Sequence, residues 1–188
     1  MKKKLSDMTL EELWPLFPIV LTGPSKDWKN WFNEEYSLLK NVLPKDKIYA
    51  INHIGSTAID NIWSKPIVDI LVEINSKSDF TKIKSLLISA NYLCMSEGES
   101  RLSFNKGYTE DGYAPKVYHL HLRLKGDNDE IYFRDYLNKY PLIAKEYETL
   151  KISLWKQFTQ NRDAYTEMKT AFVKEQTQKA EKQISAAN

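Results

Sequence analysis

Cysteine and long apolar runs are nearly absent from this sequence. The one cysteine, Cys94, excludes an intramolecular disulfide. No apolar run approaches the roughly 18 residues that a membrane-spanning helix needs. No apolar stretch follows the basic start Met1-Lys-Lys-Lys, so the start does not have the pattern of a signal peptide. We therefore expect a soluble, cytoplasmic protein with no membrane partner.

Charge of one sign is also lacking. The 27 basic residues nearly balance the 25 acidic ones, which leaves a formal net charge of +2. A chain with this balance has no electrostatic reason to bind nucleic acid or an anionic membrane as its main partner. Of the basic residues, four are arginines, which can hold a phosphate with two parallel hydrogen bonds; they are Arg101, Arg123, Arg134 and Arg162.

The length and composition fit one compact domain over residues 1–188. The chain is 42% hydrophobic and 28% charged, which is enough apolar material for a sizeable core. The first part, about residues 1–125, has the apolar alternation of sheet strands. Residues 126–188 have helical periodicity and are expected to pack on the sheet as C-terminal helices.

The most informative stretch is Lys65-Pro-Ile-Val-Asp-Ile-Leu-Val-Glu-Ile, which follows His53-Ile-Gly-Ser-Thr. Its run of β-branched and apolar residues predicts a strand covered on both faces. Asp69 interrupts the run. An unpaired carboxylate in such a strand costs about several kcal/mol, so a metal ion, a base or hydrogen-bond donors are expected beside Asp69.

These two stretches resemble the GrpB-like family, a bacterial group in the DNA polymerase beta-type nucleotidyltransferase superfamily. The resemblance extends from about residue 10 to residue 180 and implies an α/β (α+β) fold, a mixed sheet flanked by helices with a C-terminal helical segment. It also implies that Gly55 and Ser56 hold the phosphates of a nucleotide and that Asp69 is the catalytic acid and a metal ligand. Lys65, just before the strand, is either a phosphate contact or a solvated lysine.

The sequence departs from the superfamily pattern at one position. Where a second acid is expected two residues after Asp69, the chain has Leu71. Glu73 is on the same face of the strand, but at about 3.3 Å per residue it lies roughly 13 Å from Asp69, too far to share a metal ion. We predict a solvated strand end for Glu73.

A second polar row occurs in the alternating stretch Tyr118-His-Leu-His-Leu-Arg-Leu. The alternation places His119, His121 and Arg123 on one face of a strand. If this strand neighbours that of Asp69, the two imidazoles and the carboxylate could hold a divalent ion, magnesium or manganese, or zinc through the histidines. Arg123 would then add a phosphate contact. In the alternative, both histidines form structural hydrogen bonds.

The remaining pattern predicts the other elements. Strands are expected at 47–54, 92–95 and 101–104, a loop that could flank the site at 105–115, and helices at 25–43, 78–90, 130–138, 141–160 and 163–184. Arg134, Lys151, Arg162 and Lys169 on these helices could line the open side of the site, although a solvated face is the commoner role for such residues.

Two functions remain in view. The first is an enzyme that binds a nucleotide or phosphorylated small molecule with a divalent metal and transfers a nucleotidyl group to a small acceptor. The second, favoured by Leu71, is a non-catalytic nucleotide-binding, metabolite-binding or interaction module that keeps the fold without the full acidic set.

Overall fold

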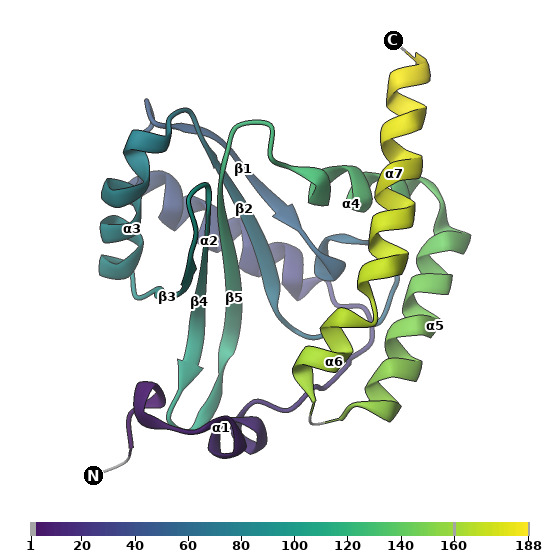
Figure 1. Cartoon of the computed structure of the whole chain (residues 1–188), viewed down its shortest axis with the longest axis horizontal. Coiled ribbons are helices and arrows are strands. Elements are labelled where there is room, and N and C mark those ends of the chain that lie inside the picture. Colours follow the sequence, from purple (N-terminus) through teal and green to yellow (C-terminus); the bar gives the residue numbers. More distant parts are fainter. Residues whose placement is uncertain (1–2, 160, 188) are drawn as a thin grey trace.

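The computed structural model describes residues 3–159 and 161–187. Its centre is a five-stranded mixed sheet in the order β1-β2-β5-β4-β3 (Figure 1). The strands are β1 (Ile48–Ile54), β2 (Val68–Ile74), β3 (Leu93–Glu97), β4 (Arg101–Thr109) and β5 (Gly112–Leu124). The central pair β2 and β5 is parallel, and the other neighbours are antiparallel. The predicted mixed sheet flanked by helices is therefore confirmed.

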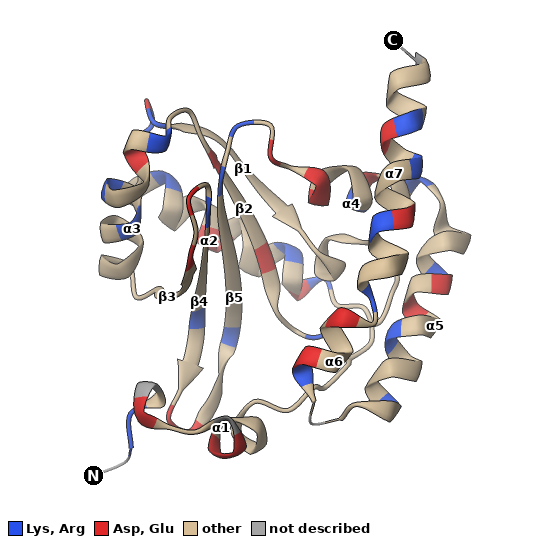
Figure 2. Cartoon of the chain, viewed as in Figure 1, with Lys and Arg blue, Asp and Glu red and all other residues tan. Residues whose placement is uncertain are grey.

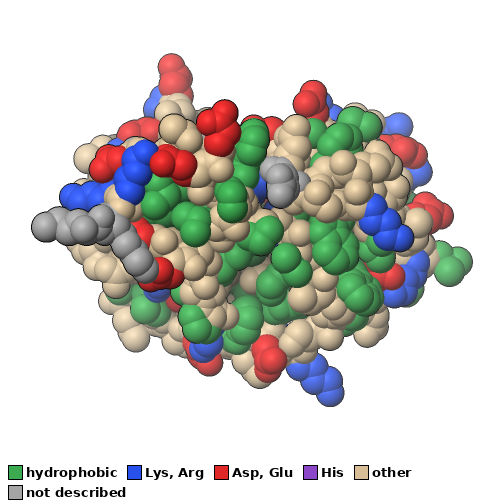
Figure 3. Space-filling view, turned by 90° about the horizontal axis from the view of Figure 1, so that it is seen from below, with side chains coloured by type: hydrophobic (Ala, Val, Ile, Leu, Met, Phe, Trp, Pro, Cys, Tyr) green, Lys and Arg blue, Asp and Glu red, His purple; other side chains and the backbone are tan. Residues whose placement is uncertain are grey.

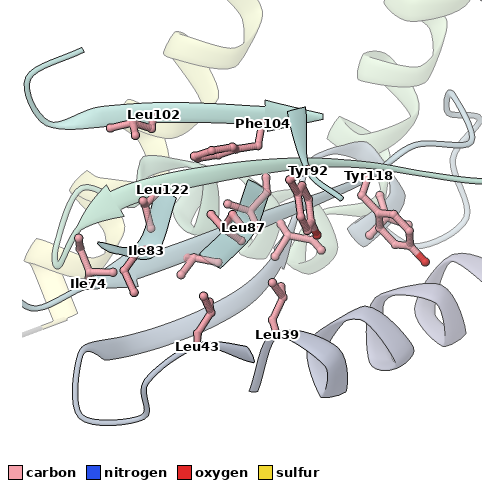
Figure 4. Packing of buried hydrophobic residues seen from close by; sticks show 14 of the residues in the cluster. Leu39, Leu43, Ile74, Ile83, Leu87, Tyr92, Leu102, Phe104, Tyr118 and Leu122 are labelled. Carbon is pink, nitrogen blue, oxygen red and sulfur yellow. The ribbon is translucent and has the colours of Figure 1, made fainter. Parts of the chain in front are cut away.

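One face of the sheet carries the main hydrophobic core. Helices α2 (Asp27–Val42) and α3 (Phe80–Ser89) cover this face, and their apolar side chains pack against those of the strands. Figure 4 shows Leu39 and Leu43 on one side of this core, with Leu122 and Phe104 on the strands above them. Because side chains alternate along a strand, the residues between these core positions point to the opposite face.

The remaining helices form a second group beside the sheet (Figure 1). They are α4 (Asp129–Lys139), α5 (Pro141–Gln157), α6 (Arg162–Glu167) and α7 (Thr170–Ala187). Their apolar cluster includes Phe133, Tyr147 and Ala180, and it takes in Ile59 and Ile62 from the segment between β1 and β2. That segment therefore joins the helices to the sheet. Gln160, the predicted end of the second of these helices, is outside the described residues.

The first helix is short. Thr9 caps α1 (Leu10–Leu16) by accepting a hydrogen bond from the Glu12 N–H, and the Glu12 side chain accepts one from the Thr9 N–H. This reciprocal pair satisfies two N–H groups that have no partner inside the helix.

Two predicted elements were wrong. The expected loop at 105–115 is the far end of the β4–β5 hairpin, because Gly107, at φ +89°, lets the register shift while both strands continue to the Thr109–Gly112 turn. The expected single helix at 163–184 is broken between α6 and α7. Tyr165 packs with Ile19 and Leu154, whereas Ala180 packs with the α4 cluster, so one straight helix could not serve both clusters.

Glu73 also differs from the expectation of a solvated strand end. It is 1% exposed, and its carboxylate accepts hydrogen bonds from the Gly126 N–H and the Asn128 side chain. The chain turns back over the end of β2 after β5, and this turn covers the carboxylate.

The surface carries mixed charge and scattered apolar groups. Figure 2 shows basic and acidic residues interspersed over the helices and strands, as expected for a nearly neutral chain. Figure 3 shows apolar side chains gathered in the middle of the face seen from below. Among the described helices, none combines the length and the apolar character required to cross a membrane.

Candidate active site

Asp69 and the two histidines meet on the sheet face opposite the main core. In the parallel pairing of β2 with β5, Asp69 stands beside His119 and Leu71 beside His121. The Nδ1 atom of His119 is 3.2 Å from Oδ1 of Asp69, and Nε2 of His121 is 3.8 Å from the same oxygen. The Asp69 side chain is 24% exposed. The structure thus brings together three residues that are distant in sequence.

This environment keeps Asp69 ionised. Burial alone would raise its pKa, but hydrogen bonds and positive charge from His119 and His121 outweigh burial and hold the pKa well below the usual range. For His119, burial is the larger effect and lowers its pKa, although Asp69 acts in the opposite direction. A neutral imidazole beside a carboxylate is the expected state near pH 7.

The Gly-Ser turn lies against the same carboxylate. Ile54 pairs with Asp69 across β1 and β2, so Gly55 is the next residue beside the acid. Gly55 has φ +70° and ψ −171°, and a Cβ atom built on it would be 2.2 Å from Oδ2 of Asp69. No other residue fits here without displacement of the acid. The turn continues into a 3-10 helix, Ser56–Ala58.

Each histidine also contacts a second side chain. Nε2 of His119 is 2.8 Å from the Tyr108 hydroxyl, which accepts a hydrogen bond from Arg162 at 3.1 Å. Nδ1 of His121 is 3.4 Å from an Arg123 nitrogen. The Arg123 side chain is 8% exposed and donates a hydrogen bond to the carbonyl of Leu102, so it is buried beside His121. Its predicted phosphate contact stays a prediction.

Three cationic side chains gather next to this face. The Nζ atoms of Lys65 and Lys169 are 5.5 and 4.3 Å from the centre of the Tyr165 ring, and the Arg162 guanidinium is 5.8 Å from that of Tyr108. We call Lys65, Arg162 and Lys169 the cation cluster. None of the ion pairs found among residues 3–159 and 161–187 involves any of the three.

The two lysines of the cluster have a lowered pKa, chiefly because they are buried. Burial first, and then the charges of Lys169 and Arg162, lower the pKa of Lys65 to about 8. Burial lowers the pKa of Lys169 to about 8, with Asp69 acting in the opposite direction. Asp69 is thus close enough to influence the cluster electrostatically.

Lys151 lies near the cation cluster and also fixes the Gly55–Ser56 turn. It is 1% exposed and donates hydrogen bonds to the carbonyl of Trp63 and, at 3.1 Å, to the hydroxyl of Ser64. The Ser64 hydroxyl donates in turn to the carbonyl of Ser56. Burial, followed by the charges of Lys169 and Lys65, lowers the pKa of Lys151 to about 7. A helix residue is thereby linked to the Gly55–Ser56 turn.

Arg134 has a supporting role as well. It donates a hydrogen bond of 2.7 Å to the carbonyl of His53 and so fastens α4 to the end of β1. His53 itself stacks on Phe32, on the other face of the strand from the acid.

Two hollows adjoin the site. A groove of about 650 Å³ lies between α2 and the β4–β5 hairpin and has Tyr108 in its wall. A smaller hollow of about 90 Å³ has Lys65 in its wall, among Pro18, Pro66 and Pro115. Tyr108 therefore contacts His119 and also lines the groove, and Lys65 belongs to the cation cluster and also lines the smaller hollow.

A metal site is not evident in the side-chain geometry. Within residues 3–159 and 161–187, no group of three or more His, Cys, Asp or Glu side chains is placed to hold an ion. The nitrogens of His119 and His121 point at the carboxylate oxygen of Asp69, so the three groups contact one another directly. The predicted magnesium, manganese or zinc ion stays a prediction.

The whole chain was compared with known proteins. The model of the GrpB protein family matches residues 18–179. The chain belongs to the GrpB family. Among its relatives, the glutamate-rich protein GrpB of Alkalihalophilus pseudofirmus is 37% identical over 163 residues, which cover 84% of this chain and 92% of that protein. The UPF0157 protein YqkA of Bacillus subtilis is 31% identical over 170 residues, 89% of this chain, but the chain spans about half (48%) of that relative.

Solved structures give the same result. The crystal structure of the conserved protein GrpB from Enterococcus faecalis has a TM-score of 0.76 at 29% identity and covers 88% of this chain and 99% of that one. The poly(U) polymerase Cid1 with MgGTP bound has a TM-score of 0.50 at 12% identity, over 79% of this chain and 46% of Cid1. The second likeness shows that the fold is nucleotidyltransferase-like.

The sequence predicts Asp69 as a partner of His119, but it does not indicate the contact of His119 with Tyr108 or the burial of the lysines. Tyr108 falls in the predicted loop at 105–115, and nothing in the local pattern indicates that it reaches a histidine. Lys151 was expected on a solvated helix face, because a lysine between exposed residues is usually solvated. Its burial depends on the position of the segment between β1 and β2, which sequence periodicity does not determine.

Proposed function

We propose that this protein binds the phosphate groups of a nucleotide or of another phosphorylated small molecule between the Gly55–Ser56 turn and the cation cluster. The observation that carries the proposal is the gathering of Lys65, Arg162 and Lys169 without a carboxylate in ion-pair contact. Like charges held close together raise the free energy of the folded state. A bound anion of high charge density removes that cost, and phosphate is the anion that arginine and lysine bind best in proteins.

The turn favours the same ligand. The missing side chain at Gly55 leaves room for the Asp69 carboxylate, and the positive φ of the turn is of the kind that presents successive backbone N–H groups to an anion. Lys151 fixes the turn through Ser64. Lys151 and the turn are therefore parts of one hydrogen-bonded unit, and Lys151 lies close enough to Lys65 and Lys169 for their charges to lower its pKa.

Nucleotidyl transfer to a small acceptor is the second candidate function. It is favoured by the position of Asp69 on the central strand beside a Gly-Ser turn, in a fold of the kind that Cid1 has. Asp69, which is ionised, could accept a proton from an acceptor hydroxyl. A divalent ion held by Asp69 would supply charge neutralisation on the phosphoryl oxygens. Binding without turnover is the alternative outcome.

The test is thermal unfolding with each nucleoside triphosphate and with inorganic pyrophosphate, with and without magnesium or manganese. A ligand at about a hundred times its dissociation constant stabilises the native state by about 2.7 kcal/mol. For a chain of this size the midpoint then rises by roughly 5 to 10 °C. Lys65→Met and Lys169→Met should abolish the rise, and Lys174→Met, which removes an exposed lysine from α7, should preserve it.

The outcomes separate the candidates. A rise of the unfolding midpoint with pyrophosphate as well as with triphosphates would mean that the protein recognises the phosphate groups of the ligand. A rise in the wild type that persists in both cluster variants, or no rise with any of these ligands, contradicts the proposal. If binding is established, release of pyrophosphate from a bound triphosphate in the presence of small hydroxyl and amine acceptors tests transfer.

A further inference from the structure

The direction of each hydrogen bond around His119 can be worked out from its partners. Arginine has donors and no acceptor, so the Arg162 contact makes the Tyr108 oxygen an acceptor. Nδ1 of His119 is 3.2 Å from Oδ1 of Asp69, and a carboxylate oxygen can only accept, so the proton of the neutral ring is on Nδ1. Nε2 is then the acceptor, and the Tyr108 hydroxyl donates to it at 2.8 Å. The reverse assignment would set a lone pair of Nδ1 against a carboxylate oxygen, which is repulsive.

His121 is oriented by a different arginine. The Arg123 nitrogen 3.4 Å from Nδ1 of His121 can only donate, so Nδ1 is the acceptor and the ring proton is on Nε2. Nε2 is the atom that faces Asp69, 3.8 Å from Oδ1. Both imidazoles therefore direct an N–H group at the same carboxylate oxygen, through opposite ring nitrogens.

A ring nitrogen that carries a proton has no lone pair for a metal ion. We infer that His119 and His121 are positioning residues that hold Asp69 through N–H groups, with Tyr108 and Arg123 fixing their tautomers, and are not ligands of a divalent ion. The position where the superfamily has its second acid offers no further carboxylate ligand, because it is occupied by Leu71, which is 0% exposed. The inference concerns the proposed site but does not depend on phosphate binding.

The third histidine provides an internal reference. The Thr57 hydroxyl donates to the carbonyl of Ile67 at 3.1 Å, so its oxygen accepts from Nε2 of His53 at 3.0 Å. His53 is therefore protonated on Nε2. The chain contains three histidines, and the inference assigns all of them: Nε2–H for His53 and His121, and Nδ1–H for His119.

The experiment is a long-range proton–nitrogen NMR correlation on the ¹⁵N-labelled full chain near pH 8, well above the usual imidazole pKa of about 6.5. The tautomer of each ring is read from its two nitrogen shifts, without any ligand. His119→Gln and His121→Gln assign the signals. Should one of them not fold, Tyr108→Phe and Arg123→Met identify the rings by the shifts they perturb. We expect one Nδ1–H ring, that of His119, and two Nε2–H rings.

Metal addition completes the test. On titration with Zn²⁺, the rings of His119 and His121 should keep their nitrogen shifts and their tautomers. An Nε2–H tautomer for His119, or a change of tautomer or a large change of the nitrogen shifts of either ring on addition of Zn²⁺, would overturn the inference. Failure of the proposed function is visible separately, as the absence of a triphosphate-induced thermal shift.

Discussion

Lys65 and Lys169 share one aromatic ring. Their Nζ atoms lie 5.5 and 4.3 Å from the centre of Tyr165, although one residue precedes the central strand and the other lies between the last two helices. The ring attracts both cations through its negative face, but it cannot neutralise them. The arrangement is therefore costly in the absence of an anion, and this cost leads to the first prediction.

Stability should rise with pH through the range in which these lysines lose their protons. Their pKa of about 8 in the folded chain is below the unfolded value of about 10.4. Between the two values the unfolded chain binds more protons, so the free energy of unfolding increases with pH. In urea denaturation from about pH 8 to about pH 10, Lys169→Met should reduce the slope by up to about 1.4 kcal/mol per pH unit.

The matched control for this slope is Lys174→Met on the exposed side of α7. It should leave the pH dependence as in the wild type. Equal slopes in the wild type and Lys169→Met would mean that Lys169 is not desolvated in the folded state.

Gly55→Ala should destabilise the chain for two separable reasons. The backbone conformation at φ +70° and ψ −171° is almost restricted to glycine and costs about 1–3 kcal/mol for other residues. The new Cβ would also meet Asp69 Oδ2. Gly126→Ala is the control, because Gly126 has φ +88° but nothing within 4 Å of an added Cβ. Urea denaturation should give a larger loss at Gly55 than at Gly126.

A double-variant cycle isolates the contact with Asp69. In the Asp69→Ala background the Gly55→Ala change should cost less than in the wild type, since the carboxylate that it displaces is gone. Equal costs in the two backgrounds would show that the backbone alone is responsible.

The strands, and the faces that carry Asp69 and the histidines, follow from local patterns. The apolar run at 67–74 and the strict alternation at 117–124 each define a strand and its faces, and residue type identifies the polar positions. What the sequence leaves open is which strands are neighbours. The structure answers this with the parallel β2–β5 pair.

The cation cluster could not be predicted in the same way. Its members come from the segment just before β2, from α6 and from the turn after α6. The predicted continuous helix at 163–184 would have placed Arg162 and Lys169 differently. The break between α6 and α7 arises from competition between two apolar clusters. Such competition depends on tertiary packing, which overrides a helical period. The extended hairpin that brings Tyr108 to His119 was missed for a related reason, because Gly107 looks like a loop residue and acts as a bulge.

Lys151→Met should loosen the segment between the Gly-Ser turn and β2. The change leaves the carbonyl of Trp63 without its Lys151 donor in a partly buried hydrogen bond, which costs about 1–3 kcal/mol. Amide hydrogen exchange at residues 56–64 should become faster than in the wild type. Lys145→Met is the comparison, because Lys145 reaches the carbonyl of Asn61 in the same segment from a side chain that is 55% exposed. Its loss should cost less than about 1 kcal/mol.

Comparable exchange rates in Lys151→Met and the wild type would contradict the role of Lys151. The segment would then be held by its other contacts, such as the Thr22–Ser64 bridge.

The most direct measurement of phosphate recognition is titration calorimetry with inorganic triphosphate near pH 8 in two buffers of different ionisation enthalpy. Lysines whose pKa is about 8 are half protonated there, and a bound polyanion raises their pKa. We predict binding with net proton uptake, both strongly reduced in the Lys65→Met/Lys169→Met double variant and retained in Lys174→Met. Absence of binding in the wild type, or binding of equal strength and proton uptake in the double variant, would contradict the account.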